Sequence, residues 1–319
     1  MAGFEDMTGA GLTSGGKAAS PGHIAVMCEA ATDAVVGGGR EGVFVDATFG
    51  GGGHSRMLLQ KISADARLIA LDCDEDAAKR AGEVADARFC FYRRNFADLT
   101  QVLAEAGAVS VQGVLFDLGL SSYQLADAER GFSFSRAGGL DMRMDRREEM
   151  TAQKLLRDSG VESLAKTLRD YGEEPEARRI AKALASMKTP PADTLLLAKF
   201  IATVKHKPFG GGKLNPATRV FQALRIAVNR ELESLADGLE AARRALAVGG
   251  RLAVLAFHSL EDRMVKRFAA GVAFPGMGKV AAGELAAVGG MQKPDAMEVA
   301  ANPRSRSAKL RVFERGGGR

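Results

Sequence analysis

The stretch VFVDATFGGGGHS, residues 43–55, decides how the rest of the sequence is interpreted. It opens with a short apolar run ending in Asp46, which predicts a buried strand. The glycines at 50–53 then predict a tight turn, because glycine lacks a Cβ and lets the backbone approach a ligand closely. Apolar residues return at helical spacing over residues 55–62. The stretch therefore predicts a strand, a glycine-rich loop and the N-terminus of a helix.

A second predicted strand, residues 67–71, ends at Asp72. Nucleotide-binding folds hold ribose hydroxyls with a carboxylate at this place, about 20 residues beyond the glycines. Strand, loop, helix, strand and carboxylate in this order predict a site for an adenosine-containing cofactor. The alternative is a glycine-rich connection in an α/β domain that binds nothing.

The glycine pattern bears on which cofactor is bound. Dinucleotide sites use G-x-G-x-x-G, and residues 50–55, GGGGHS, lack the third glycine. Asp46 precedes the loop and would repel a diphosphate, whereas it suits the cationic amino-acid part of S-adenosylmethionine. These features favour a methyltransferase over the main alternative, an NAD-dependent oxidoreductase.

Composition narrows the class of protein. The chain has 319 residues, 46% of them hydrophobic, which is enough for a core and more than one typical domain. No apolar run reaches about 18 residues, so we expect no membrane partner. The net charge of +5 permits a polyanionic partner without establishing one. Three scattered cysteines and four separated histidines predict no disulfide framework, no metal site and a reducing, cytoplasmic compartment.

The sequence divides into four expected segments. Residues 1–20 lack periodicity and an apolar stretch after a basic start, so we expect a disordered tail rather than a signal peptide. Residues 21–148 and 215–319 carry the strand patterns and are expected to form one domain, which ends in a basic segment. Residues 149–214 carry apolar positions at helical spacing and predict a helical insertion, whose end, residues 205–213, is expected to be a flexible basic linker.

Two residues follow other predicted strands. Asp117 ends the strand predicted for residues 113–116 and is expected at the carboxyl edge of the sheet, facing the group with which the cofactor reacts. Its alternative role is to cap the next turn. Phe96 follows the strand predicted for residues 88–92 and is expected beside the adenine, with a core position as the alternative. Residues 127–145 lack periodicity and predict a folded loop over the cleft.

Basic residues in the second half are candidates for nucleic-acid contacts. The pair Asn215-Pro216 predicts the start of one helix whose apolar face continues to Leu239. Arg219 lies off that face, and the segment NPRSRS, residues 302–307, supplies Arg304 and Arg306 before a last strand. These three arginines are predicted to contact phosphates, and the alternative is an ordinary solvated surface.

Several runs of sequence together resemble the RsmH (MraW) family of bacterial methyltransferases. They are DATFG (46–50), GGHS (52–55), DLGLSS (117–122), ERGFSF (129–134), LDMRMD (140–145), YGEE (171–174), PATR (216–219), FHSLEDR (257–263) and NPRSRS (302–307). The resemblance extends in order from His23 to about Arg315. The chain departs from the family pattern at Leu214 and Ala256, which stand where a histidine and a serine are usual.

The resemblance implies a fold and an activity. The fold would be a Rossmann-like, S-adenosylmethionine-dependent methyltransferase domain of the α/β class, with a mostly helical substrate-recognition domain inserted in it. The activity would be methylation of the exocyclic N4 of a cytidine in the decoding centre of 16S rRNA, within the small ribosomal subunit. By position, the implied cofactor contacts are Gly52, Gly53, His54, Asp72, Phe96, Asp117 and Gln124.

One residue is a candidate for the chemistry itself. The N4 lone pair of cytosine is delocalised into the ring, so a hydrogen-bond acceptor on the amine would help to localise it and would favour loss of a proton. Our hypothesis is that Asp117, or a backbone carbonyl within residues 118–121, is this acceptor. A non-catalytic RNA-binding assembly factor is the second alternative, and the glycine loop with Asp72 argues against it.

Overall fold

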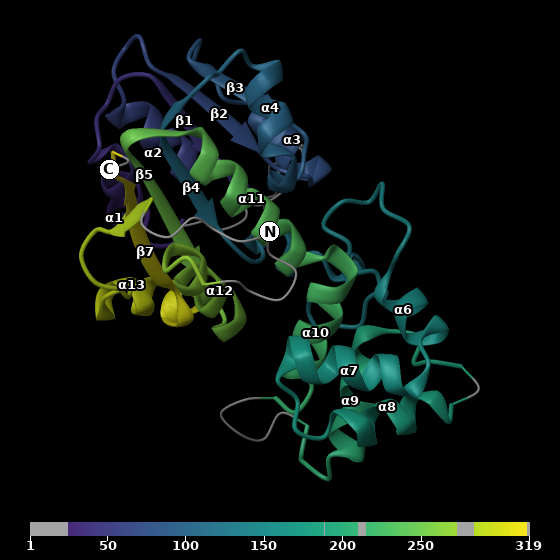
Figure 1. The fold of residues 1–319 in the computed structure, drawn as a ribbon. Helices are drawn as coiled ribbons and strands as arrows, with labels where there is room; N and C mark the ends of the chain where they lie inside the picture. The colour runs from purple at the N-terminus through teal and green to yellow at the C-terminus, as the bar shows by residue number, and fades with distance from the viewer. Residues whose placement is uncertain (1–24, 188, 210–214, 273–283, 318–319) are drawn as a thin grey trace, which may run out of the picture.

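The computed structural model describes residues 25–187, 189–209, 215–272 and 284–317. Figure 1 shows two parts, a twisted sheet flanked by helices and a cluster of helices beside it. The predicted tail and residues 210–214, in and after the predicted linker, lie outside the described residues.

The described residues form a seven-stranded sheet in the order β3-β2-β1-β4-β5-β7-β6. Strands β1 to β5 pair in parallel, and β7 is antiparallel to β5 and β6. The strand order reverses between β1 and β4, as in doubly wound folds. This topology confirms the predicted Rossmann-like α/β fold. The strands are β1 (Val43–Asp46), β2 (Arg67–Leu71), β3 (Phe89–Tyr92), β4 (Val111–Asp117), β5 (Leu246–Ala256), β6 (Leu285–Ala287) and β7 (Lys309–Arg315).

Successive residues of the central strands enter different cores. Val45 and Ile69 pack with helices of one face, whereas Phe44 and Leu68 pack with helices of the other. Neighbouring side chains of a strand point to opposite faces, and a parallel sheet covered on both faces therefore needs continuous apolar runs. The first set of helices is α4 (Leu99–Glu105), α11 (Glu231–Ala245) and α12 (Ser259–Ala269), and the second is α1 (Cys28–Val36) and α2 (Gly53–Lys61).

The fifth strand is longer than its apolar pattern predicts. It begins at Leu246 rather than Leu252, because residues 246–250 continue the extended chain and Leu246 pairs with Val111 of β4. The glycines at 249–250 hide this part of the strand from an apolar pattern. The predicted strand end at Phe257 is one residue too late, since β5 ends at Ala256.

The helical cluster has its own core. Leu164, Ile180 and Ile201 are fully or almost fully buried there, together with Phe132 and Leu140 from the irregular loop. The division of the chain at residues 149 and 214 stays a prediction, and these buried contacts extend beyond it on both sides. The helices of this cluster are α6 (Ala152–Asp158), α7 (Val161–Gly172), α8 (Ala177–Ala185), α9 (Thr194–Val204) and α10 (Thr218–Asn229).

The prediction of one continuous helix after Asn215 was wrong. The helix breaks at Arg230, which adopts a left-handed φ of 49°, and α11 begins at the next residue. The Asn229 amide holds the break in place, because it donates to the carbonyl of Met142 and accepts from the N–H of Met144. The break lets α10 pack into the helical cluster and α11 pack on the sheet.

Polar contacts also join the two parts. The carboxylate of Glu173, after α7, accepts hydrogen bonds from Ser259 and Arg263 of α12, each at 2.8 Å. The Tyr171 hydroxyl donates to Glu233 of α11 at 3.1 Å.

The remaining elements are α3 (Glu75–Ala81), η1 (Phe96–Asp98), α5 (Ser122–Ala126), η2 (Ala128–Arg130), α13 (Ala296–Ala301) and η3 (Pro303–Ser307). Among the helices of the described ranges, none has the length and apolar character needed to cross a membrane.

A buried ion pair joins the segment after α7, the end of α9 and the segment before α10. The Nζ of Lys205 lies 2.7 Å from Oε2 of Glu174 and 3.0 Å from the carbonyl of Pro216, and both charged side chains are more than nine-tenths buried. Removing one partner of such a pair leaves an uncompensated buried charge.

We therefore predict that Lys205→Met lowers the free energy of unfolding by about 3–5 kcal/mol. The matched control is Lys166→Met, which breaks an ion pair whose lysine is 72% exposed and is expected to cost about 0–1 kcal/mol. Urea unfolding measures both. Equal losses in the two variants would contradict the prediction, and Glu174→Gln added to Lys205→Met is expected to recover part of the loss.

Candidate functional site

A cavity of about 920 Å³ opens at the carboxyl ends of β1, β2 and β4. Its walls come from the glycine loop, from residues 117–125 after β4, from the irregular loop after η2, and from α10 and α11. In doubly wound sheets, ligands bind at this edge, beside the point where the strand order reverses. The cavity therefore lies where the sequence predicts the cofactor.

The glycine loop shapes one wall of the cavity. Gly52 has a φ of 76°, and a Cβ there would lie 2.6 Å from the Phe49 ring. A Cβ on Gly53 would lie 2.7 Å from that of Ala25. Gly53 lines the cavity, whereas Gly52 is not among the lining residues and turns the chain into α2.

Asp72 is held by the backbone at the end of β2. Its Oδ2 accepts the Gly50 N–H at 2.7 Å, and its Oδ1 accepts the Asp74 N–H at 2.9 Å. Burial raises the pKa of Asp72 to about 6, although the two backbone hydrogen bonds oppose this. Asp72 lines the cavity and offers its remaining lone pairs to hydroxyl donors.

Asp46 lies behind the loop instead of facing the cavity. It is fully buried, and its Oδ2 accepts the Ser55 hydroxyl at 2.6 Å while its Oδ1 accepts the Thr48 N–H at 3.2 Å. Burial raises its pKa, and His54 opposes the rise. Asp46 therefore fixes the turn around the cavity, and a cation bound there would meet its field without contacting the carboxylate.

Asp117 and His54 meet at the centre of the site. The Nδ1 of His54 lies 3.5 Å from Oδ2 of Asp117, and the two side chains are 4% and 19% exposed. The Asp117 backbone N–H donates to the Thr48 hydroxyl at 2.6 Å. Its Oδ1 is buried and has no hydrogen-bond partner in the described residues. A buried carboxylate oxygen left without a donor is an acceptor for a ligand group.

Phe96 and Gln124 line the cavity but are also used by the fold. The Phe96 ring packs edge-on against Phe116, with centroids 5.5 Å apart. Phe96 is therefore packed as a core residue, which was the alternative expected from the sequence, and also lines the cavity. The Gln124 Oε1 accepts the Ser121 N–H at 2.9 Å, and its Nε2 donates to Asp74 at 2.8 Å. Gln124 therefore anchors the turn after β4 as well as facing the cavity.

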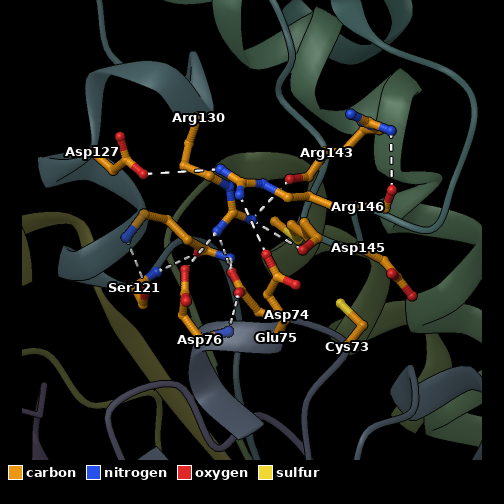
Figure 2. A network of polar contacts seen from close by, with 12 residues as sticks. Cys73, Asp74, Glu75, Asp76, Ser121, Asp127, Arg130, Arg143, Asp145 and Arg146 are labelled. Atoms are coloured by element: carbon orange, nitrogen blue, oxygen red, sulfur yellow. Dashed lines mark hydrogen bonds and ion pairs between the residues drawn. The ribbon is translucent and has the colours of Figure 1, made fainter. Parts of the chain in front are cut away.

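Arg130 lies within the irregular loop and connects the segment after β2 with a later part of the same loop. Figure 2 shows its side chain pointing at Asp74 and Asp76. Its side chain is 2% exposed and lies 2.8 Å from Asp74. The same guanidinium donates to the carbonyls of Arg143 and Met144 at 2.9 and 3.0 Å. The sequence does not reveal this residue as a link, because its partners come from distant segments of the chain.

A second polar cluster lies at the far wall. Atoms of Glu231, His258 and Glu261 that could each ligate a metal ion lie within 4.8 Å of one another. Glu231 makes two hydrogen bonds of 2.8 Å with Arg225, and one Glu261 oxygen accepts the N–H groups of Phe257 and His258. The Arg225–Glu231 contacts join α10 to α11, and the Glu261 contacts fix the start of α12. The sequence patterns did not reveal this cluster. They predict no metal site, and that absence stays a prediction.

The three predicted phosphate contacts lie at different places. Arg304 is exposed and lines the cavity. Arg306 is exposed in the same short helix but is not among the lining residues. Arg219 is exposed on α10 and donates to the carbonyl of Glu173 at 3.0 Å, so part of its guanidinium is used within the protein.

The lining residues fit the cofactor expected from the sequence. A nucleoside needs a backbone cradle, an acceptor for ribose hydroxyls and an apolar surface for the base, which Gly53, Asp72 and Phe96 offer. A sulfonium is cationic, and the buried carboxylates of Asp46 and Asp117 supply a negative field. This donor set is suited to S-adenosylmethionine rather than to a diphosphate.

Arg130 supports a prediction about the irregular loop. In Arg130→Met the loop loses two carbonyl anchors, so amide exchange at Met142 and Met144 is expected to rise at least about tenfold, equivalent to 1.4 kcal/mol. Hydrogen exchange with mass spectrometry measures this. Arg157→Met, whose side chain is 60% exposed, is the control. Unchanged exchange in the Arg130 variant would show that the loop holds its place without the guanidinium.

Comparisons with known proteins agree over nearly the whole chain. The model of the MraW methylase family matches residues 20–316. Ribosomal RNA small subunit methyltransferase H of Cupriavidus necator is 45% identical over 312 residues, covering 92% of this chain and 92% of its own. The protein of that name from Delftia acidovorans is 45% identical over 307 residues, covering 92% and 97%. Among solved structures, the N-methyltransferase NodS from Bradyrhizobium japonicum WM9 has 8% identity and a TM-score of 0.39, covering 91% of this chain and 95% of its own.

The family model and the relatives at 45% identity confirm the resemblance drawn from the short sequence runs. They also confirm S-adenosyl-L-methionine as the predicted cofactor, since the matched family is one of methylases. A family model that spans almost the full length, with relatives at 45% identity, leads to one assignment. The chain belongs to the MraW methylase family.

Proposed function

We propose that this protein methylates the exocyclic N4 of a cytidine in the decoding centre of 16S rRNA, in the small ribosomal subunit and in the cytoplasm. The names of the relatives support a ribosomal RNA substrate. The choice of an amine as the methyl acceptor rests on Oδ1 of Asp117. This oxygen is a buried hydrogen-bond acceptor on the wall of the cavity and has no partner among the described residues.

The cofactor site is proposed from the residues described above. Bound S-adenosylmethionine supplies an electrophilic methyl group. Asp72 accepts hydrogen bonds from ribose hydroxyls, Phe96 covers one side of the base, and Gly53 lets the backbone come close. His54 and Gln124 complete the wall and hold Asp117 and Asp74 in place. Gly52 contributes the turn that leads into α2.

The acceptor side of the cavity is apolar and aromatic. Phe132, Phe134 and Phe221 line it, and the rings of Phe134 and Phe221 meet edge-on at 4.8 Å. A base must leave its stack to react in such a pocket, at a cost of a few kcal/mol, and aromatic side chains offset part of that cost by stacking. We propose that the target cytosine enters between these rings and Asp117.

The RNA backbone is proposed to contact the exposed arginines. Arg304 stands at the cavity itself, and Arg306 and Arg219 lie on exposed surfaces of η3 and α10. Contacts to phosphates position a nucleic acid without reading its sequence. Arg304 is therefore the first candidate for holding the strand beside the flipped nucleotide.

The decisive experiment supplies labelled S-adenosylmethionine to small subunits from a strain that lacks this protein. Transfer of one methyl to the N4 of a decoding-centre cytidine, mapped by mass spectrometry, is the expected result. Labelling of another position would refute the proposed target. RNA binding without transfer would favour an assembly factor, and binding of NAD without response to S-adenosylmethionine would favour an oxidoreductase.

The raised pKa of Asp72 predicts how cofactor binding depends on pH. Its value of about 6 means that the carboxylate is ionised at pH 7 and mostly protonated at pH 5. If the ionised form holds the ribose, affinity for S-adenosylmethionine falls about tenfold between pH 7 and pH 5. Calorimetric titration measures it. In Asp72→Asn, affinity is expected to be lower at pH 7 and to change less with pH; an unchanged profile would remove Asp72 from the site.

Arg304 gives a prediction about salt. Arg304→Gln is expected to weaken binding of small-subunit RNA and to lower the slope of log Kd against log salt by about one, as loss of one phosphate contact requires. Arg157→Gln serves as the matched control, because its side chain is 60% exposed and pairs with Asp158. A slope equal to that of the unchanged protein would place the RNA elsewhere.

A further inference from the structure

His54 has a fixed hydrogen-bonding direction. It is buried at the start of α2, and its Nε2 lies 3.0 Å from the carbonyl oxygen of Val26. A carbonyl only accepts, so Nε2 carries a proton. The neutral ring therefore presents an unprotonated Nδ1 to Asp117, whereas the imidazolium presents an Nδ1–H donor; this nitrogen lies 3.5 Å from Oδ2 of Asp117.

Asp117 is a carboxylate with two different oxygens. Oδ2 faces the imidazole, whereas the buried Oδ1 has no partner among the described residues. Both residues line the cavity. One oxygen thus faces the imidazole, and the other is left for a ligand donor in the same cavity.

The charges around Asp117 oppose one another. Burial raises the pKa of Asp117 to about 6, His54 lowers it, and the nearby carboxylates of Asp46 and Glu261 raise it. The neighbouring Cys28 thiol, whose pKa burial raises to about 11, stays neutral. His54 is therefore the group among these neighbours that favours the ionised carboxylate.

We propose that His54 is a positioning residue: its imidazolium form donates from Nδ1 to Oδ2 of Asp117 and stabilises the carboxylate, so that Oδ1 accepts the proton released by amine methylation. This inference rests on the proposed function and goes beyond the role of His54 as a cofactor contact.

The proton balance of the step follows from the chemistry of the amine. The N4 lone pair forms a bond to the methyl carbon while the electrons of the carbon–sulfur bond remain on sulfur. The methylated nitrogen then carries one proton too many and a positive charge. Oδ1 of Asp117 takes that proton, which leaves a neutral N4-methylcytidine and a carboxylic acid. The proton passes to water when the products leave, and Asp117 is ionised again. A protonated Asp117 cannot accept it, so the step requires the carboxylate.

The test is the pH dependence of methyl transfer in His54→Gln. Glutamine keeps an N–H donor for the Val26 carbonyl and removes the ring nitrogen that faces Asp117. Single-turnover rates are measured between pH 5 and pH 9 with small subunits and with S-adenosylmethionine at saturation, which calorimetry verifies for each variant. The control His206→Gln replaces an exposed histidine remote from the cavity.

In the unchanged protein, the rate is expected to fall as pH drops through about 6, where Asp117 becomes protonated. In His54→Gln the midpoint of this fall is expected to move up by about one pH unit, because a nearby positive charge lowers a carboxylate pKa by about 1–3 units. The rate at pH 6 then drops about fivefold more than the rate at pH 9, because the ionised fraction of Asp117 at pH 6 falls from about one half to about one tenth. His206→Gln is expected to keep the original profile.

Two outcomes would overturn the proposal. A rate lowered equally at all pH values in His54→Gln, with the midpoint unchanged, would show that the histidine only supports the fold. An acid fall that persists in Asp117→Asn would show that another group accepts the proton. Failure of the proposed function is distinguishable from both, since the unchanged protein would then transfer no methyl to the cytidine at any pH.

Discussion

Three parallel strands that end side by side in aspartates are the constraint on which this structure depends. β1, β2 and β4 place Asp46, Asp72 and Asp117 at one edge of the sheet. Burial raises the pKa of all three carboxyls, which means that charge at this edge is costly unless donors or cations compensate it. The glycine loop and the start of α2 compensate this charge, because they donate hydrogen bonds to the carboxylates of Asp46 and Asp72. Oδ1 of the third has no hydrogen-bond partner in the part of the chain that the structure describes, and chemistry is proposed at this oxygen.

The rest of the molecule brings a second surface to this edge. Arg130, itself part of the irregular loop, binds the segment after β2 and a later part of the loop. The Asn229 amide, at the break between α10 and α11, binds the same loop. The same loop therefore contacts both the segment after β2 and the end of α10.

Much of this architecture could be predicted from the sequence, because local patterns encode it. The apolar run before Asp46, the glycines after it and the carboxylate of Asp72 are contiguous signals, and the structure places them as expected. The break at Arg230 was missed, since the apolar face continues across it and the cause is a distant loop bound by Asn229. The pairing of Arg130 with Asp74 was missed for the same reason. Side-chain partners far apart in sequence leave no periodic trace.

The most direct test of the central claim is a proton count on cofactor binding. S-adenosylmethionine is titrated into the purified protein at pH 6 in buffers of different ionisation enthalpy, and the observed enthalpy is plotted against the buffer value. Carboxyls with pKa values of about 6 are partly protonated in the free protein, and a cation bound beside them favours the ionised form. Net proton release is therefore expected at pH 6 and is expected to disappear by pH 8. Tight binding with no proton exchange at pH 6 would contradict it.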